Sequence, residues 1–315
     1  APVEEAIREN LVENAPKAGK IKKTTYNETL GTTEWTLSNG VRVVVKPTTF
    51  KQDEILFHAF SQGGRSLVAT ADLPSAILAT DVVELGGLAD MSATDLQKAL
   101  TGKRVSVSPT ISAYSEGVNG SSTVKDLETL LQLNYLYFTA PRRDEESYQT
   151  LMSILDSQLA NRDKNPKVAW SDSVQMMASN YSDRTLIVNK ELLSKASLDK
   201  ALEVYKARFA NPADFTFFFV GNVDPADPAF QTMVCTWLGG LKANKKLEKA
   251  ADDKVRVAMG IQKNYFTRQM ETKTASNRIQ YTSYDMPYTL ANDLNMEMIG
   301  RILSTRYLES IRERE

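Results

Sequence analysis

The chain has few of the residues that metal sites and covalent catalysis use most often. Its 315 residues include one histidine, His58, and one cysteine, Cys235. There is therefore no histidine pair and no cysteine cluster to bind zinc, and a lone cysteine excludes an intrachain disulfide framework. We interpret His58 as a packed, hydrogen-bonded residue and Cys235 as a buried structural thiol, since neither has a catalytic partner nearby in the sequence.

The chain also lacks an excess of charge and any long apolar run. Lys and Arg number 38 and Asp and Glu 39, so the formal net charge is −1. This balance gives no electrostatic reason to expect binding to nucleic acid or to an anionic membrane. No apolar run is long enough to predict a membrane span. With 42% hydrophobic and 24% charged residues, the composition is that of an ordinary globular protein, long enough for two domains.

A hairpin, a strand and a helix follow one another early in the chain. Asn39-Gly40 separates two β-prone runs and predicts a type I′ turn, in which both residues take positive φ. The run Ile55–Phe60 is apolar on both faces apart from His58, which predicts a central strand covered on both sides. A helix is expected over residues 73–85, with Asp72 as its N-cap and Gly86-Gly87 as its stop signal.

Several short motifs, taken in order, resemble the pitrilysin/insulinase family of zinc peptidases and its bacterial PqqL-like branch. They are Leu37-Ser-Asn-Gly-Val-Arg-Val-Val-Val45, Ser61-Gln-Gly-Gly64, Gly102-Lys-Arg-Val-Ser-Val-Ser-Pro109, Glu116-Gly-Val-Asn-Gly120, Asp126-Leu-Glu128 and Ala140-Pro-Arg142. The resemblance runs over most of the chain from about Gly31. It implies an α+β fold, in which an antiparallel-rich sheet packs on helices.

The expected first helix lacks the family's catalytic motif. Active members carry an inverted zinc motif, His-x-x-Glu-His, whose two imidazoles bind zinc while the glutamate activates a water molecule. Here residues 73–85 read Leu-Pro-Ser-Ala-Ile-Leu-Ala-Thr-Asp-Val-Val-Glu-Leu, without histidine. The resemblance is therefore to a non-catalytic, C-terminal half of such a peptidase. We expect no cofactor in this chain, with zinc in an upstream half.

The predicted organisation has four parts. Residues 1–30 are a connector with a short helix over 3–14, and residues 31–241 are a complete α+β pitrilysin-like domain. Residues 242–254 are polar and charged and are interpreted as an interdomain linker. Residues 255–315 are interpreted as the opening of a second, truncated α+β domain, with strands over 264–272 and 277–284 and a long helix from Leu290. That helix has no stop signal before Glu315, which is typical of the edge of a longer protein.

The remaining elements are predicted from periodicity, capping residues and turn signals. Helices are expected over 92–100, 123–136, 145–160, 166–180, 198–209 and 230–238, and strands over 103–108, 111–118 and 215–221.

One residue is a candidate for substrate binding. In the family, an arginine after the last long helix of the second half, together with a tyrosine, holds the substrate backbone at the distant zinc site. Ile311-Arg312 matches the arginine segment, and no matching tyrosine follows within this chain. Arg312 is thus a candidate substrate-binding residue, with a surface arginine in an ion-pair network as the alternative.

The leading hypothesis is a chamber wall with substrate contacts, serving peptide hydrolysis that an upstream half catalyses. Its partners would be that half and a peptide substrate. One alternative is a catalytically inactive family-like scaffold, and another is a peptide-binding module. The resemblance implies the bacterial periplasm or cell envelope. The sequence does not identify the peptide, the cleavage specificity or the oligomeric state.

Overall fold

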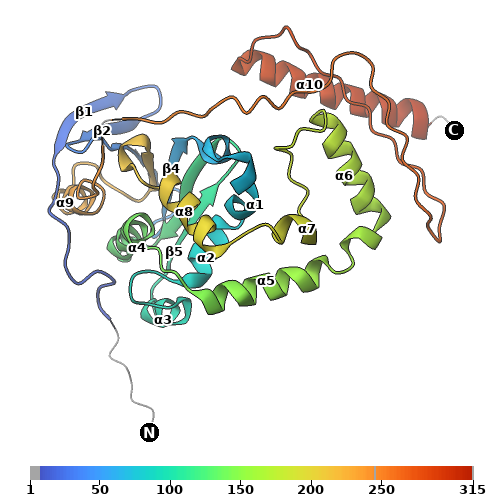
Figure 1. Cartoon of the computed structure of the whole chain (residues 1–315). Coiled ribbons are helices and arrows are strands. Elements are labelled where there is room, and N and C mark those ends of the chain that lie inside the picture. The colour runs from blue at the N-terminus through green and yellow to red at the C-terminus, as the bar shows by residue number, and fades with distance from the viewer. Residues whose placement is uncertain (1–7, 245, 314–315) are drawn as a thin grey trace. The chain divides into compact units, whose positions relative to one another are not determined.

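The computed structural model describes residues 8–244 and 246–313, which divide into two compact units, Ala1–Phe266 and Thr267–Glu315. The first unit, called unit 1 below, contains a seven-stranded sheet and nearly all the helices (Figure 1). Its strands are β1 (Ile21–Asn27), β2 (Thr32–Leu37), β3 (Arg42–Pro47), β4 (Ile55–Gln62), β5 (Val105–Ile111), β6 (Ser115–Ser122) and β7 (Thr216–Gly221).

The α-helices of unit 1 follow or separate these strands. They are α1 (Leu73–Ala76), α2 (Ala79–Gly86), α3 (Ala93–Ala99), α4 (Leu127–Thr139), α5 (Glu145–Leu159), α6 (Pro166–Ala178), α7 (Lys190–Leu193), α8 (Leu198–Arg208) and α9 (Pro228–Trp237). Short 3₁₀ turns lie at Gly64–Leu67, Thr70–Asp72, Arg162–Lys164 and Pro212–Asp214. No helix in the described part of the chain is both long and apolar enough to cross a membrane.

The strand order is β1-β2-β3-β7-β4-β6-β5. Only the β3–β7 pair is parallel, and every other pair is antiparallel. The predicted α+β class and antiparallel-rich sheet are therefore confirmed. The strand β7, which comes last in the sequence, lies between β3 and β4, so the centre of the sheet forms only when distant parts of the chain meet.

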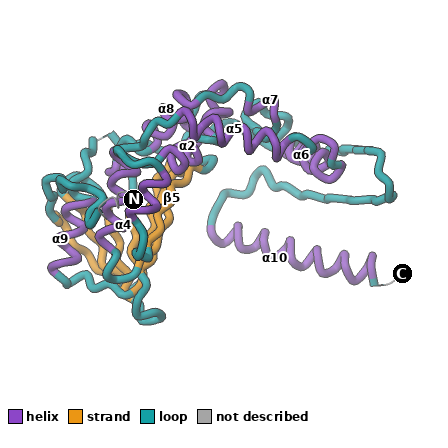
Figure 2. The backbone as a smooth tube through the Cα atoms, turned by 90° about the horizontal axis from the view of Figure 1, so that it is seen from below, coloured by secondary structure: helices purple, strands orange, loops and turns teal. Residues whose placement is uncertain are grey.

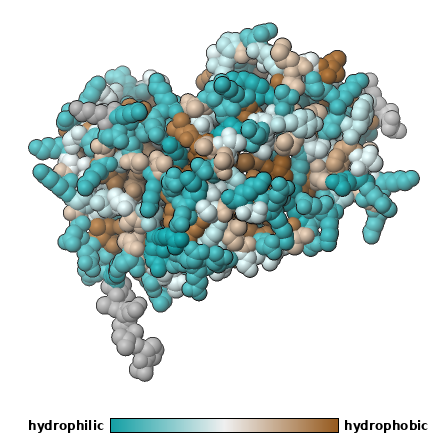
Figure 3. Space-filling model, in the orientation of Figure 1, coloured by the Kyte–Doolittle hydropathy of each residue, from teal (hydrophilic) through white to brown (hydrophobic). Residues whose placement is uncertain are grey.

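An aromatic cluster forms the core between the sheet and the helices. Phe215, Phe217 and Phe219 are fully buried beside or on β7. The ring of Phe57 on β4 lies 5.1 Å from that of Phe219, and the ring of Phe138 on α4 lies 5.8 Å from that of Phe217. Figures 1 and 2 show α2 and α8 on one side of the strands. Figure 3 views this helical side, where hydrophilic residues surround scattered hydrophobic areas.

The Asn39-Gly40 hairpin is confirmed, but its turn is not of type I′. β2 and β3 pair antiparallel around it. Gly40 has φ +89°, whereas Asn39 is not among the described residues with positive φ. The amide of Gly40 donates to the carbonyl of Leu37, and the side chain of Asn39 accepts from the amide of Val41. The side-chain amide of Asn39 also donates to the carbonyls of Leu238 and Leu241. These long-range hydrogen bonds fix the side chain of Asn39 in the turn.

The helix predicted over 73–85 is two helices, α1 and α2, separated by Ile77 and Leu78. Asp72 makes no side-chain capping bond and instead lies 3.7 Å from the ammonium of Lys200. The stop at Gly87 is confirmed, since its φ of +88° suits glycine. The helix α2 packs on α5, α8 and β5.

Two predictions for the N-terminal connector are wrong where the structure describes it. The predicted helix over 3–14 lies partly outside the described residues, and residues 8–14 are irregular. The amide of Leu11 donates to Oε1 of Gln132 at 2.7 Å instead of to a helical carbonyl. Residues 21–27 form the edge strand β1 rather than a connector. An exposed edge strand needs little alternation of apolar and polar residues, so the polar sequence of β1 gave no strand signal.

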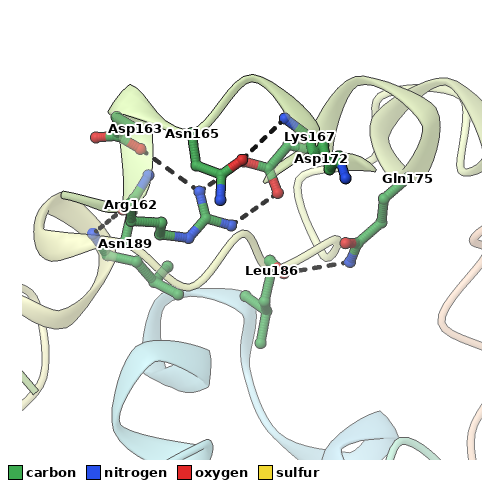
Figure 4. Close-up of polar contacts among 9 residues, drawn as sticks. Arg162, Asp163, Asn165, Lys167, Asp172, Gln175, Leu186 and Asn189 are labelled. Atoms are coloured by element: carbon green, nitrogen blue, oxygen red, sulfur yellow. Dashed lines mark hydrogen bonds and ion pairs between the residues drawn. The ribbon is translucent and has the colours of Figure 1, made fainter. Parts of the chain in front are cut away.

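Within unit 1, the helices α5, α6 and α7 form an arm that extends away from the sheet (Figure 1). Side chains cap two of these helices at their N-termini: Asp144 accepts from the amide of Ser147, and Asn165 accepts from that of Lys167. Both guanidinium Nη atoms of Arg162 bind the Asp172 carboxylate, at 2.6 and 2.7 Å (Figure 4). This bidentate pair fixes the turn between α5 and α6.

The other predicted helices and strands of unit 1 are confirmed, with ends that shift by a few residues. In the second unit, the helix predicted from Leu290 is α10 (Leu290–Tyr307), and a π-helical turn, Leu308–Arg312, follows it. The strands predicted over 264–272 and 277–284 are absent from the described residues. A strand needs a partner for its backbone hydrogen bonds, and these segments have none in a sheet. The four-part domain division stays a prediction.

Candidate functional site

The sheet of unit 1 has one face covered by helices and one open face, which is the candidate functional site. Burial alternates strictly along β4: Ile55, Phe57, Ala59 and Ser61 are buried, and the residues between them are exposed. The prediction that this strand is covered on both sides is therefore wrong. Its apolar sequence is present on both faces, but only one face belongs to the core.

Strand register places a row of side chains across this open face. Val44 pairs with Phe218, Phe218 with His58, and His58 with Asn119. The rings of His58 and Phe218 have centroids 6.0 Å apart. Nδ1 of His58 lies 2.7 Å from Oδ1 of Asn119, and since an amide oxygen only accepts, this nitrogen carries the proton. His58 is thus hydrogen-bonded as predicted, but it is exposed rather than packed.

Two large apolar side chains flank His58 on the same strand face. Leu56 is 49% exposed and Phe60 is 43% exposed. Their cross-strand partners on β7 are Val220 and Thr216, both half-buried. Contiguous exposed apolar surface on a sheet usually marks a surface that contacts another molecule. This arrangement offers apolar contact with a histidine at its centre, and it brings no nucleophile or metal ligand set together.

A buried carboxyl group joins two of the quoted motifs at one end of the sheet. Oε1 of Glu116 accepts from the hydroxyl of Ser61 at 2.9 Å, and Oε2 accepts from the amide of Gly64 at 2.5 Å. Glu116 is only 2% exposed. Burial raises its pKa to about 7, against the two hydrogen bonds and the charge of Arg208, which act to lower it. The bonds tie the Ser61–Gly64 segment to β6.

Sequence reasoning assigned no role to Glu116 beyond its place in a motif. A signal was present, since Glu116 occupies a core-facing position of its strand, two residues before the buried Val118. A carboxyl at a position reserved for apolar side chains needs partners inside the protein. The sequence could not name those partners, because Gly64 and Arg208 lie far from Glu116 along the chain.

The other candidate residues lie apart from one another. Cys235 on α9 is half-buried, and burial raises the pKa of its thiol. Arg312 ends the π-helical turn of the second unit and is exposed; its predicted contact with substrate is untested. The helix α2 carries Asp81 and Glu84 but no histidine. Among residues 8–244 and 246–313, no three or more His, Cys, Asp or Glu side chains are grouped as a metal site. The residues present do not fit the zinc site of the peptidases.

Comparison with known proteins identifies relatives of this sequence. It is 29% identical over 241 residues to a protein from Arabidopsis thaliana named zinc protease PQQL-like, covering 76% of this chain and 22% of the relative. It is 25% identical over 250 residues to the probable zinc protease PqqL of Escherichia coli, covering 77% of this chain and 26% of that protein. The chain thus spans about a quarter of the length of these relatives. No family model matches it.

Solved structures share the fold. The periplasmic protease PqqL from Escherichia coli matches with a TM-score of 0.67 and 23% identity, over 79% of this chain and 27% of that one. An inactive M16 peptidase domain from Pseudomonas fluorescens matches with a TM-score of 0.55 and 14% identity, over 70% and 54%. Pitrilysin matches with a TM-score of 0.56 and 12% identity, over 79% and 26%. The predicted resemblance to pitrilysin-type, PqqL-like zinc peptidases is confirmed.

Proposed function

We propose that this chain is the non-catalytic, C-terminal part of a pitrilysin-type zinc metallopeptidase. In this proposal, unit 1 forms part of the wall of a chamber that encloses a peptide, and an upstream half carries zinc and its ligands. The observation that supports this proposal is the open face of the sheet. Helices cover one side of the sheet, and on the other side the exposed Leu56 and Phe60 can contact an extended peptide.

The polar groups of the open face suit this task. His58 and Asn119 bond to each other through Nδ1 and Oδ1. This leaves the imidazole Nε2 to accept from a peptide N–H and the amide NH₂ of Asn119 to donate to a peptide carbonyl. Positioning of a substrate by contacts remote from the reacting bond lowers the barrier, because orientation is achieved before the chemical step. The chain's contribution would be binding and orientation, with no proton transfer or metal chemistry of its own.

A catalytically inactive scaffold is the second candidate function. The similarity to a solved structure described as an inactive M16 peptidase domain favours it. The open face would then contact another protein instead of a substrate. A His-x-x-Glu-His helix in the sequence that precedes this chain in the full-length protein would support the peptidase, and its absence there would support the scaffold. For location we propose the periplasm or cell envelope, because one similar structure is that of a periplasmic protease.

Removing the apolar side chains of the open face tests the contact with substrate. In the full-length protein, Leu56→Ser combined with Phe60→Ser should lower kcat/KM for peptide cleavage about tenfold, with zinc content unchanged. Both side chains are exposed, so the variant should unfold at nearly the same temperature as the wild type. Peptide-cleavage kinetics, elemental analysis and thermal unfolding measure the three quantities.

Phe50→Ser is the matched control for this variant. Phe50 is 93% exposed and lies outside the strands, so its loss should leave kcat/KM unchanged. Equal kcat/KM for the wild type and the Leu56/Phe60 variant would remove the open face from the substrate path. It would favour the scaffold instead.

Arg312→Ala tests the predicted arginine contact. An arginine that binds the peptide backbone contributes a charged hydrogen bond, so peptide turnover by the full-length protein should fall about tenfold or more. Zinc content should not change, because the arginine would bind substrate and not metal. The control is Arg301→Ala, which breaks only the exposed pair with Glu297 on α10. Unaltered turnover in Arg312→Ala would make it a surface residue.

A further inference from the structure

Within unit 1, a segment that follows α9 is held against the rest of the unit by side chains. The strap, as we call residues 244 and 246–253, has no regular secondary structure. Asn211, which is 6% exposed, donates to Oδ1 of Asn244 and to the carbonyl of Lys246, and accepts from the amide of Asn244. These hydrogen bonds give the buried side-chain amide of Asn211 partners on the strap.

Further bonds follow along the strap. The amide of Glu248 donates to Oδ1 of Asp214 at 2.9 Å, and the amide of Ala251 donates to Oγ of Ser66 at 2.9 Å. The hydroxyl of Tyr114 lies 3.0 Å from both carboxylate oxygens of Asp253. The strap backbone is therefore attached through side chains alone, without a sheet or helix, and most of its residues are exposed. Such an attachment opens more easily than a core element.

The strap covers a buried charge cluster next to the Ser61–Gly64 turn. Nη1 of Arg208 lies 3.1 Å from Oε2 of Glu248, although Arg208 is only 6% exposed. The contact lacks hydrogen-bond geometry, since Nε and Nη1 of Arg208 have no hydrogen-bond partner. A Cβ added at Gly63 would meet Nη1 of Arg208 at 2.9 Å and Oε2 of Glu116 at 3.0 Å, so both groups border the same glycine. One guanidinium thus lies near two carboxyl groups.

The charged groups that act on Glu116 lie on α8 and on the strap. Arg208 on α8 favours its ionised form, and Glu248 on the strap disfavours it. Asp214 interacts with Glu248 and Arg208, and Arg42 on β3 offsets part of its charge. Arg65 donates to the carbonyl of Ile111, the cross-strand partner of Glu116 on β5. On β4, Ser61 contributes a hydroxyl that can also bond the carbonyl of Gln62 when the Glu116 carboxyl carries a proton.

We propose that the strap is a proton-controlled latch, which stays docked while Glu116 is protonated and is released when Glu116 loses its proton. With Glu116 neutral, Glu248 is the carboxylate that compensates the buried Arg208. With Glu116 ionised, two carboxylates share one guanidinium, and their repulsion falls when Glu248 leaves for solvent and water reaches Glu116. The inference concerns the strap alone and holds whatever molecule contacts the open face.

The sign follows from reciprocity between docking and protonation. Burial is the largest cause that raises the pKa of the Glu116 carboxyl to about 7, and the Glu248 charge, which docking brings close, raises it as well. Protonation must therefore favour docking by the same factor. Docking is therefore favoured at pH 5.5 and weakens as pH rises through about 7.

Amide hydrogen exchange of the full chain at pH 5.5 and pH 8 tests the latch. After correction for intrinsic exchange rates, protection of peptides over 244–253 should fall about tenfold at pH 8, which corresponds to one pKa unit of coupling. Glu116→Gln should abolish the fall, because glutamine keeps the hydrogen bonds and cannot ionise. Glu28→Gln, at an exposed site, should keep it. Equal protection of the wild type at both pH values would overturn the proposal, as would a tenfold fall in Glu116→Gln.

A second variant covers the case in which Glu116→Gln fails to fold, which loss of protection in β4 and β7 would reveal. In Glu248→Gln, the strap loses the carboxylate that pairs with Arg208. Its protection should be lower than in the wild type at pH 5.5 and should change less than twofold between the two pH values. A tenfold fall retained in Glu248→Gln would also overturn the latch.

Discussion

Phe217→Ala should lower the free energy of unfolding of unit 1 by about 3–5 kcal/mol, the usual cost of removing a buried phenylalanine. Phe217 is fully buried on β7, the strand that joins β3 to β4. Its ring is 5.9 Å from that of Phe57 and 5.8 Å from that of Phe138, so its removal leaves a cavity between the sheet and α4. Urea unfolding followed by circular dichroism measures the change.

Phe218→Ala is the matched control, one residue further along the same strand. Phe218 lies on the open face beside His58 and is only half-buried. Its truncation removes less buried area and leaves no closed cavity, so we expect a loss of about 1 kcal/mol. Similar losses for the two variants would mean that both faces of β7 belong to a core, which would contradict an open sheet face.

This difference between neighbouring residues explains what the sequence could predict about the sheet. Apolar residues on both faces of β4 predict burial on both sides, and the period-2 pattern cannot separate a face buried in the core from one that contacts another molecule. Most helices of unit 1, the hairpin at Asn39-Gly40 and the class of fold were predictable, because capping residues, turn residues and periodicity act locally.

The elements that the sequence did not predict depend on partners distant in the chain. The edge strand β1 exists because β2 offers it a ladder, although its own residues are polar. Residues 264–272 have a β-prone sequence but no such ladder among the described residues, and they form no strand. In both cases the deciding factor is backbone hydrogen bonding to another strand, which side-chain pattern alone does not encode.

The candidate site shows the same limit. The motifs Ser61-Gln-Gly-Gly64 and Glu116-Gly-Val-Asn-Gly120 were recognised separately, and the structure explains why they occur together. Glu116 accepts from both Ser61 and Gly64, and Gly64 has φ +57° in a turn where a Cβ would meet backbone atoms of Ser112 and Ser115 at 2.4 Å. The motifs thus describe one buried carboxyl group and the tight turn that reaches it.

This chain alone should not hydrolyse peptides. Hydrolysis at neutral pH needs a metal-bound water or an activated nucleophile. The only thiol, Cys235, is half-buried with a raised pKa, and the only histidine, His58, lies on the open face bonded to Asn119. We therefore expect no cleavage of a fluorogenic peptide library above buffer and no stoichiometric zinc after dialysis. Peptide fluorescence and elemental analysis check the two expectations.

Supplying the upstream half should restore cleavage, because enclosure and orientation of a substrate can lower a barrier by several kcal/mol. Matched reactions would contain the upstream half alone, the two parts mixed, and the mixture with the Leu56→Ser, Phe60→Ser form of this chain. The mixture should cleave faster than the upstream half alone, and the variant should recover only part of the gain, since it folds but lacks the apolar contacts of the open face. Chelator-sensitive cleavage by this chain in isolation, at one zinc per chain, would overturn the non-catalytic assignment, because the metal ligands would then lie within these 315 residues.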